Sequence, residues 1–327
     1  MQQDSALRFA LCAVAPLSAL TEDPTVIEIL VTGTQEVFVE RLGSRPEPTD
    51  IRLSQDQLDG IVANLANLSR KTVDLHGGDG HLIVSTRLPG FRVEAQLPPV
   101  AVGGPYVTIR RLNSMAMSLE EYVARGTLSQ ELANFLRAAV QRRANILVSG
   151  GTSTGKTTFL NSLVREVDSS DVILTIETVQ ELVVPHRGAR RFEADDEQGY
   201  GVQRLVKSAL RSRPDRILIG EVRGGEAFDL LDAANSGHPG SMASLHANGA
   251  MEAIERFENL ILEGRPAMPL PAVKKRIADT FELVVHMERV VRDGRFIRRL
   301  GEIVAIEGYD RVNDTYQLKS VFSTQDL

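Results

Sequence analysis

The sequence has few of the residues that crosslink proteins or anchor them in membranes. Among its 327 residues there is one cysteine, there is no tryptophan, and aromatic side chains make up only 5%. Because Cys12 stands alone, the chain forms no internal disulfide and no thiolate zinc site, which indicates a reducing, cytoplasmic compartment. No run reaches the roughly 20 consecutive apolar residues that a membrane-spanning helix needs. Any attachment to a membrane would therefore depend on partner proteins.

The apolar run near the N-terminus differs from a signal peptide. Arg8 and Pro16 interrupt the run Ala6–Leu20, and Asp4 stands where a signal peptide carries positive charge. We expect an ordinary first helix that ends before Pro24.

An excess of positive charge is also lacking. The 37 basic side chains are outnumbered by 43 acidic ones, which gives a formal net charge of −6. Bulk electrostatics therefore does not favour nucleic-acid binding, and we expect no direct binding of nucleic acid. A few local basic groups remain, and a solvated or inter-subunit surface is their simplest interpretation. They are Lys274-Lys275-Arg276, Arg289, Arg292, Arg295, Arg298 and Arg299.

The chain has enough apolar material for two cores. Hydrophobic residues make up 43% and charged residues 24%, which excludes the disordered and collagen-like classes. In residues 1–112, helical patterns and short β-like runs predict a small α+β domain. Its expected strands are Val26–Val31, Glu36–Arg41, Leu82–Leu88, Phe91–Leu97 and Tyr106–Leu112. A helix is expected after the capping-box pair Ser54 and Gln57, with Leu58, Ile61, Val62, Leu65 and Leu68 on one face.

A change of pattern separates this domain from the rest of the chain. We expect a linker at 113–127, because neither the helical nor the strand period holds around Asn113–Met117. Residues 128–327 then alternate strands with helices, which predicts an α/β domain with a mainly parallel sheet covered by helices. Its expected strands are Ile146–Ser149, Val172–Ile176, Ile217–Gly220 and Met242–Leu245, and its expected helices are 156–166, 200–211, 225–235 and 250–262. Near the end, Asp293-Gly294 between β-rich flanks predicts a hairpin.

The first of these strands leads into a phosphate-binding motif. The segment matches G-x-x-x-x-G-K-[ST] and has the required strand before it and helix after it. Its glycines let backbone N–H groups surround phosphate oxygens at the positive end of the helix. We expect Lys156 to reach the β- and γ-phosphates of ATP and Thr157 to ligate Mg²⁺. The predicted nucleotide-binding residues are Gly150, Gly151, Thr152, Ser153, Thr154, Gly155, Lys156, Thr157 and Thr158.

Acidic residues follow two of the other expected strands. The apolar run Ile217–Gly220 ends in Glu221, which we expect at the carboxyl edge of the sheet beside the phosphates, where it would hold Mg²⁺ or its water shell. Glu177 follows the strand Val172–Ile176, and Glu181 lies four residues further on. Glu177 is the candidate for a base that orients the attacking water, the alternative being a solvated loop glutamate.

Two histidines lie on either side of the strand at Met242–Leu245. His238 belongs to a Gly-His-Pro-Gly turn, and His246 follows the strand. A zinc pair is disfavoured because no third and fourth ligands cluster nearby and no cysteine is available. A role in sensing or contacting the γ-phosphate fits their position better, and both histidines are candidate catalytic residues.

Taken together, these segments resemble the type II/type IV secretion traffic ATPase superfamily. The four matches are its Walker A box, its Asp box at Thr175–Leu182, its Walker B box and its His box, and the stretch Arg213–Asn248 is especially similar. The N-terminal half resembles the conjugation and type IV secretion branch. That likeness is carried by Asp23–Ile29, Val37–Gly43, Leu97-Pro98-Pro99 and Thr108-Ile109-Arg110-Arg111.

The resemblance implies a PAS-like N-terminal α+β domain, a flexible linker and a RecA-like P-loop domain. It also implies a homohexameric ring that binds ATP between the two domains of each subunit. The family's catalytic and binding residues fall on Lys156, Thr157, Glu177, Glu221, His238 and His246. An arginine of its N-terminal domain, which clamps the γ-phosphate on domain closure, falls on Arg110, with Arg92 as a second candidate.

One departure from the family pattern falls in the Asp box. The family usually has Asp directly after the Asp-box glutamate, where this chain has Thr178. The cysteine-rich zinc module of many type II secretion ATPases is absent, which disfavours that branch.

Three functions compete on these grounds. The first is a hexameric ATPase whose hydrolysis cycle opens and closes the domains and powers substrate translocation or pilus assembly in a type IV secretion or conjugation apparatus at the inner membrane. The second is a RecA-like DNA motor, which would need a basic channel with stacking aromatic residues. The third is a scaffold that binds ATP with little hydrolysis.

Overall fold

The computed structural model describes residues 15–34, 36–41, 44–69, 71–74, 80–88, 90–112, 117–196, 198–292 and 295–324. The chain divides into two compact units, Met1–Asn113 and Ser114–Leu327. Cys12, most of the expected hinge at 113–117 and the expected turn at 293–294 lie outside the described residues.

The N-terminal unit is built on a sheet whose described strands pair in the order β3-β2-β1-β6-β5-β4. Every pair in it is antiparallel, so its two three-stranded meanders join through β1 and β6. The strands are β1 (Val26–Thr32), β2 (Glu36–Arg41), β3 (Glu47–Pro48), β4 (Ile83–Leu88), β5 (Phe91–Gln96) and β6 (Tyr106–Arg111). All of these strands except the two-residue β3 were expected, and they match the expected ranges to within one residue at each end.

Two described helices, α2 (Ala15–Glu22) and α3 (Gln55–Ser69), belong to this unit. α3 begins with the expected capping box, because Ser54 Oγ accepts from the Gln57 N–H at 3.2 Å and Gln57 Oε1 accepts from the Ser54 N–H at 2.8 Å. Its predicted apolar face is buried in the unit's core from Leu58 to Leu65. Leu68, in the last turn of the helix, is 38% exposed.

The C-terminal unit has a mixed sheet in the order β14-β13-β12-β7-β11-β10-β8-β9. From β12 to β9 every neighbouring pair is parallel, and only β12–β13 and β13–β14 are antiparallel. This confirms the mainly parallel sheet. The strands are β7 (Ile146–Gly150), β8 (Ile173–Glu177), β9 (Arg190–Glu193), β10 (Arg216–Ile219), β11 (Met242–Leu245), β12 (Leu283–Arg292), β13 (Arg295–Asp310) and β14 (Thr315–Ser323).

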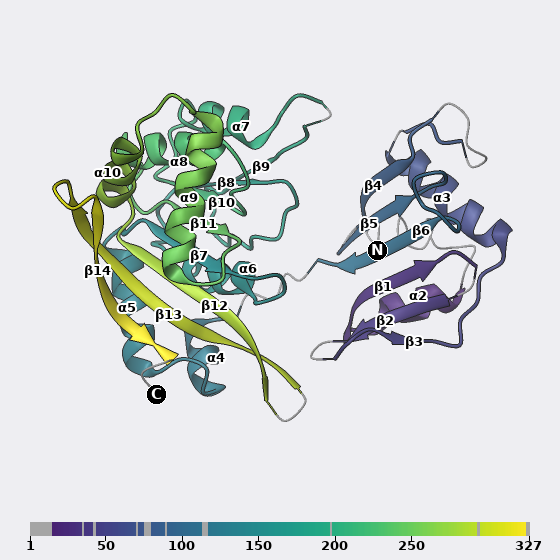
Figure 1. The fold of residues 1–327 in the computed structure, drawn as a ribbon. Helices are drawn as coiled ribbons and strands as arrows, with labels where there is room; N and C mark the ends of the chain where they lie inside the picture. The colour runs from purple at the N-terminus through teal and green to yellow at the C-terminus, as the bar shows by residue number, and fades with distance from the viewer. Residues whose placement is uncertain are drawn as a thin grey trace. The chain divides into compact units, whose positions relative to one another are not determined.

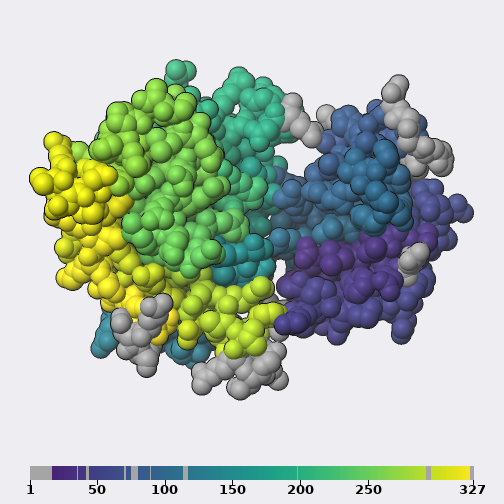
Figure 2. Space-filling model, viewed as in Figure 1, coloured from purple at the N-terminus to yellow at the C-terminus, as the bar shows by residue number. Residues whose placement is uncertain are grey.

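Helices cover both faces of this sheet (Figure 1). On one face lie α7 (Val202–Ala209), α8 (Glu226–Asn235), α9 (Ala250–Gly264) and α10 (Leu270–Thr280). On the other lie α4 (Leu119–Ala124), α5 (Gln130–Gln141) and α6 (Lys156–Val164). The segment of the chain that carries α8, α9 and α10 is green in the space-filling view (Figure 2). None of the helices in the described ranges is long and apolar enough to cross a membrane.

β7 lies inside this three-layer arrangement. Leu147 packs into the core under α7–α10, whereas Ile146 and Val148 pack into the core under α4–α6. A strand that is buried on both faces has apolar residues at successive positions, which is why the sequence pattern predicted β7. The chain that leaves the carboxyl end of β7 therefore emerges at a sheet edge where neighbouring strands also end.

The predicted hairpin near the C-terminus is confirmed. β12 and β13 pair in antiparallel fashion up to Arg292 and Arg295, on either side of the expected two-residue turn. At its other end β12 pairs in parallel with β7, and this ladder reaches Met287 opposite Gly150. The hairpin is therefore joined directly to the strand that precedes the phosphate-binding motif.

Candidate active site

The loop between β7 and α6 has the geometry of a phosphate cradle. β7 is buried along its whole length, and α6 begins at Lys156, directly after Gly155. The backbone is left-handed at Ser153, where φ is 60°, and at Gly155, where φ is 92°. Thr154 Oγ1 donates a hydrogen bond of 2.9 Å to the carbonyl of Gly151. The positive N-terminal end of a helix behind such a loop is an arrangement that binds phosphate.

Gly150 is the position of this loop where only glycine fits. Its φ is 155°, and an added Cβ would lie 2.4 Å from the carbonyl oxygen of Met287 and 2.5 Å from Thr154 Oγ1. The first of these contacts exists because β12 pairs with β7 at this residue. The start of the loop is therefore held between the neighbouring strand and its own threonine.

Lys156 is folded back against the loop. The residue is 8% exposed, and its Nζ donates to the carbonyls of Gly150 and Gly151, each at 3.0 Å. Nζ also lies 3.2 Å from Nδ1 of His246. Burial lowers the pKa of Lys156 to about 8, against the opposing effect of the Glu221 carboxylate. An anionic phosphate would favour the charged form that burial disfavours.

Glu221 and His246 meet beside this lysine. Glu221 Oε1 lies 2.8 Å from Nε2 of His246, and Glu221 Oε2 accepts a hydrogen bond of 2.7 Å from Nε of Arg223. Because Nδ1 of the imidazole faces the Lys156 ammonium, the contacts assign a neutral ring with its proton on Nε2. Burial and then the charge of Lys156 lower the pKa of His246.

These contacts join four side chains into one path, from Lys156 through His246 and Glu221 to Arg223. The elements that carry them are adjacent, because β7, β11 and β10 are consecutive in the sheet. Three residues that sequence patterns placed near the phosphates are thus brought together at the carboxyl edge of the parallel strands. Arg223 was not among the predicted residues, although its place two residues after Glu221 was a signal for it.

Glu177 is buried at the end of β8, with 3% of its surface exposed. Its Oε1 accepts hydrogen bonds of 3.0 Å from the backbone N–H groups of Glu181 and Leu182. Its Oε2 is also buried and has no hydrogen-bond partner within the described residues. Burial raises the pKa of Glu177 to about 7, while the two N–H groups oppose that shift. Its hydrogen bonds shape its own loop and do not join the Lys156–Arg223 path.

The two predicted histidines lie at opposite ends of β11. His246 follows the strand, whereas His238 precedes it and its Nδ1 lies 3.1 Å from the carbonyl of Ala233, near the end of α8. In a parallel sheet, the start of β11 lies at the edge away from the phosphate loop. The strand therefore separates His238 from the Lys156–His246 contact.

Arg92 and Arg110 lie side by side in the N-terminal unit. They are directly opposite each other on β5 and β6, so both side chains belong to one face of that sheet. Arg92 makes an ion pair of 3.5 Å with Glu94, and Arg110 is opposite Glu28 on β1. Burial raises the pKa of Glu28, and the charge of Arg110 opposes that shift.

Arg298 has a role in the loop that the sequence patterns missed. Expected at a solvated or inter-subunit surface, it is half-buried, and its Nε donates a hydrogen bond of 2.8 Å to the carbonyl of Ser153. Neighbouring residues of a strand point to opposite faces, and Arg299 pairs with Glu288 at 2.6 Å instead. Because side chains alternate between the two faces of a strand, the sequence could have predicted that Arg298 and Arg299 lie on opposite faces of β13.

The residues present fit a magnesium ion held together with a nucleotide. Mg²⁺ prefers oxygen ligands and is usually bound through one or two protein oxygens plus phosphates and water. Glu221 offers a carboxylate, and Thr157 is half-buried with no side-chain hydrogen bond in the described part of the chain. No group of three or more His, Cys, Asp or Glu side chains among the described residues forms a metal site by itself.

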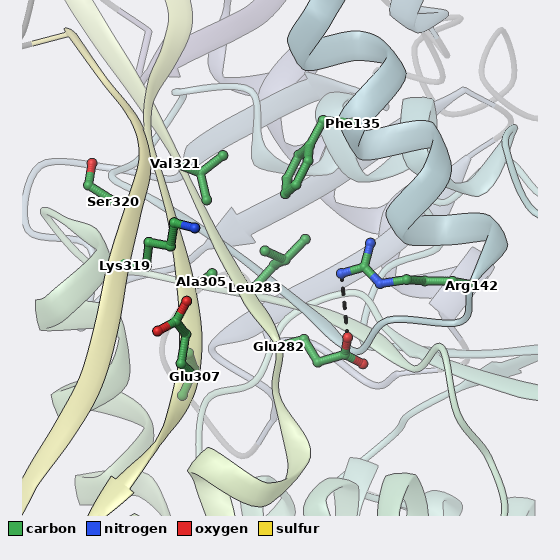
Figure 3. Close-up of a pocket in the computed structure, with 10 residues that line it drawn as sticks. Phe135, Arg142, Glu282, Leu283, Ala305, Glu307, Lys319, Ser320 and Val321 are labelled. Atoms are coloured by element: carbon green, nitrogen blue, oxygen red, sulfur yellow. Dashed lines mark hydrogen bonds and ion pairs between the residues drawn. The ribbon is translucent and has the colours of Figure 1, made fainter.

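A separate hollow of about 440 Å³ lies near the amino end of β12. Phe135 and Leu283 form part of its apolar wall, and Arg142 and Glu282 make an ion pair of 3.4 Å across its rim (Figure 3). Because the phosphate loop follows the carboxyl end of the parallel strand β7, this hollow lies at the other edge of the sheet. It contains none of the predicted site residues.

The fold and the loop define a class of protein: an α/β protein in which a parallel strand enters a glycine-rich phosphate-binding loop. Residues 12–300 match the family model described as type II/IV secretion system protein, and the chain belongs to this family.

Two relatives illustrate the similarity. The chain is 34% identical to a probable conjugal transfer protein TrbB from Sinorhizobium fredii over 315 residues, which cover 95% of this chain and 91% of the relative. It is 30% identical to the type IV secretion system protein VirB11 of Bartonella quintana, in an alignment that covers 88% of this chain and 90% of the relative.

A solved structure shares the fold. The crystal structure of the pilus retraction motor PilT with bound ADP superimposes with a TM-score of 0.63 and 19% sequence identity. The match covers 95% of this chain and 83% of that one. At this identity the likeness supports the α/β architecture with its mostly parallel sheet.

Proposed function

We propose that the protein is an ATPase that powers substrate translocation or pilus assembly in a type IV secretion or conjugation apparatus. The observation that carries this proposal is the contact path from Lys156 through His246 to Glu221 at the phosphate loop. It joins the side chain suited to bind phosphate with the one suited to hold a metal ion. Membership of the secretion-system family gives the activity its setting.

In this proposal the loop residues Gly150–Gly155 surround the phosphates of ATP with backbone N–H groups, and Thr158 lies in the first turn of α6 beside them. Lys156 leaves the carbonyls of Gly150 and Gly151 and pairs with the β- and γ-phosphates. Thr157 and Glu221 would hold Mg²⁺, and the ion would supply charge neutralisation for phosphoryl transfer. His246 holds Glu221 in place and contacts the γ-phosphate side of the site.

Glu177 is proposed to orient the attacking water and to accept its proton. A base whose pKa lies near 7 is suited to proton transfer at neutral pH, and burial raises the pKa of Glu177 to about this value. Thr178 takes the place of the usual aspartate beside it, so Glu177 carries this role without an acidic residue directly after it. For His238 the family resemblance alone supports a catalytic role.

The proposed cycle couples hydrolysis to motion of two domains, residues 1–112 and 128–327, joined by a linker at 113–127. The first is proposed to be PAS-like and the second RecA-like. Arg110, with Arg92 beside it, would contact the γ-phosphate when the domains close on ATP and release it after hydrolysis, a hinge motion biased by the nucleotide. Six such subunits would form a ring.

The proposed location is the cytoplasm, at the inner face of the membrane, where the ring would meet the secretion or conjugation machinery. Attachment would be through protein partners, and direct binding of nucleic acid is not part of the proposed function. The relatives' names, which include conjugal transfer and type IV secretion, support this setting.

The experiment measures phosphate release by the purified protein with Mg²⁺ and ATP, and the particle mass by light scattering in the same samples. We expect turnover in a particle of about six subunits, abolished in Lys156→Ala and reduced at least 100-fold in Glu177→Gln. Tight ATP binding with no turnover above these variants would overturn the proposal in favour of a scaffold. If the wild-type protein does not bind ATP, both the proposed ATPase and the scaffold alternative are overturned.

A further inference from the structure

The phosphate loop is attached at its tip to a strand that is distant in sequence. Arg298, on β13, donates from Nε to the carbonyl oxygen of Ser153 at 2.8 Å, across 145 residues of chain. Its side-chain stem passes close to the same loop, since a Cβ added to Gly155 would lie 3.4 Å from Arg298 Cδ. The arginine thus hydrogen-bonds Ser153 and lies beside Gly155, and both residues have left-handed backbone.

The loop conformation needs such support. Left-handed backbone at a residue other than glycine is unfavourable, and it persists where surrounding contacts hold it in place. Ser153 has φ of 60° and its carbonyl is the acceptor of the Arg298 bond. A charged donor makes a stronger hydrogen bond than a neutral one. The bond therefore favours the curled loop over alternatives in which the Ser153 carbonyl turns elsewhere.

Arg298 is itself held in a rigid ladder. On β12 its direct partner in the register is Arg289, whose guanidinium lies 4.5 Å from the ring centre of Phe296. The next residue, Arg299, makes an ion pair with Glu288. β12 in turn pairs with β7 as far as Gly150. One hairpin therefore fixes the loop at both places, through β12 at its start and through Arg298 at its tip.

We propose that Arg298 is a positioning residue for the nucleotide. It holds the Ser153–Gly155 tip in the conformation whose N–H groups receive the phosphates, so that little loop ordering remains to be done when ATP binds. This inference rests on the proposed function, since it concerns ATP binding at the same loop. It assigns to the β12–β13 hairpin a part in nucleotide affinity.

Two substitutions separate the hydrogen bond from the charge. Arg298→Gln keeps an amide donor at the position of the arginine Nε and removes the charge, whereas Arg298→Met keeps a side chain of similar length and removes both. Arg299→Met is the matched control, because it removes the neighbouring arginine that pairs with Glu288. The measurements are the equilibrium Kd for a fluorescent ATP analogue, KM and kcat for ATP hydrolysis, and Tm without nucleotide.

We expect Arg298→Met to raise Kd and KM on the order of tenfold, the effect of losing one hydrogen bond to a charged group, with kcat changed less than threefold. Arg298→Gln should restore Kd to within about threefold of the wild-type value, and Arg299→Met should leave it unchanged. A purely structural arginine would instead lower Tm and the active fraction at unchanged KM.

The inference is overturned if Arg298→Met binds the analogue as tightly as the wild type, or if Arg298→Gln and Arg298→Met weaken binding equally, since charge alone would then account for the effect. Failure of the proposed function is recognised separately, because the wild-type protein and Arg299→Met would then also fail to bind the analogue.

Discussion

His246 Nε2 lies 2.8 Å from Oε1 of Glu221, and the other nitrogen of the same ring faces the ammonium of Lys156 at 3.2 Å. One imidazole thus joins the end of β10 to the start of α6. Each ring nitrogen has a single function, Nε2–H as donor and Nδ1 as acceptor. The two side chains that would bind metal and phosphate are therefore set relative to each other before a nucleotide arrives.

The first prediction concerns this bridge. His246→Ala removes the donor that holds Glu221, and we expect kcat for ATP hydrolysis to fall roughly 10- to 100-fold, the usual effect of losing a group that orients a metal ligand. The Kd for ATP without Mg²⁺ should change less than threefold. Steady-state kinetics and fluorescence titration measure both. His81→Ala, at an exposed histidine of the N-terminal unit, is the control. Unchanged kcat in His246→Ala would remove the imidazole from the mechanism.

The second prediction is a loss of ATP affinity in alkaline solution. Burial lowers the pKa of Lys156 to about 8, so the free protein loses this charge as the pH rises above 8. Phosphate binding favours the charged lysine, so Kd should rise above pH 8, approaching tenfold per pH unit until the pKa in the complex is reached. His246 titrates below this window because its pKa is lowered.

Binding of a fluorescent ATP analogue without Mg²⁺, measured from pH 7 to 9.5, tests this dependence. Lys156→Ala should bind more weakly and with a Kd that is nearly constant over the same range. An equal slope in the wild-type protein and in Lys156→Ala would show that another group titrates.

The third prediction concerns stability. Burial raises the pKa of Glu177 to about 7 in the folded state, from 4.5. The group therefore stabilises the fold fully below pH 4.5, and this contribution is lost as the pH rises through 7. Glu177→Gln keeps an acceptor for the Glu181 and Leu182 N–H groups and does not titrate. Its Tm relative to wild type should thus rise by a few degrees between pH 5 and pH 8.

Thermal unfolding of both proteins across this range gives the difference directly. Glu263→Gln, at an exposed glutamate of α9, should show no such trend. A difference in Tm between wild type and Glu177→Gln that does not vary with pH would mean that Glu177 is already ionised at pH 5.

Much of the fold followed from local patterns in the sequence. The central strands β7 and β11 are apolar and buried on both faces, so their boundaries were predicted to within a residue. β9 was missed, because Arg190–Glu193 has three charged residues and becomes a strand by pairing with β8 at the sheet edge. α10 was also missed. Its buried residues Val273 and Ile277 have helical spacing. The basic run Lys274-Lys275-Arg276 lies between them and interrupts the apolar pattern.

The site was predictable in part for the same reason. Glu221 and His246 follow the parallel strands β10 and β11, and Lys156 begins the helix after β7. The carboxyl ends of neighbouring parallel strands lie at the same edge of a sheet, so these side chains are brought together. His238 has the same residue type near the same strand, but it precedes β11, and only the direction of the strand separates it from the site. The contact of Arg298 with Ser153 depends on the register of β13 and the turn of the loop, and no local pattern contains that information.

The last prediction tests how tightly the loop is built. In Gly150→Ala the new Cβ would lie 2.4 Å from the Met287 carbonyl, at a backbone angle that L-residues rarely adopt. Overpacking and backbone strain together should cost about 3 kcal/mol or more in the free energy of unfolding. Gly126→Ala is the matched control, since Gly126 also has positive φ, of 67°, but no atom lies within 4 Å of its added Cβ.

Strain alone should then cost Gly126→Ala about 1 kcal/mol, with ATP binding unchanged. Gly150→Ala should also lose ATP binding where it folds, because relief of the contact with Met287 must move the loop away from β12. Urea unfolding and titration with the ATP analogue measure the two effects. Equal losses of stability in the two variants, with binding intact in both, would mean that the loop yields at Gly150 and that its attachment to the hairpin does not fix its shape.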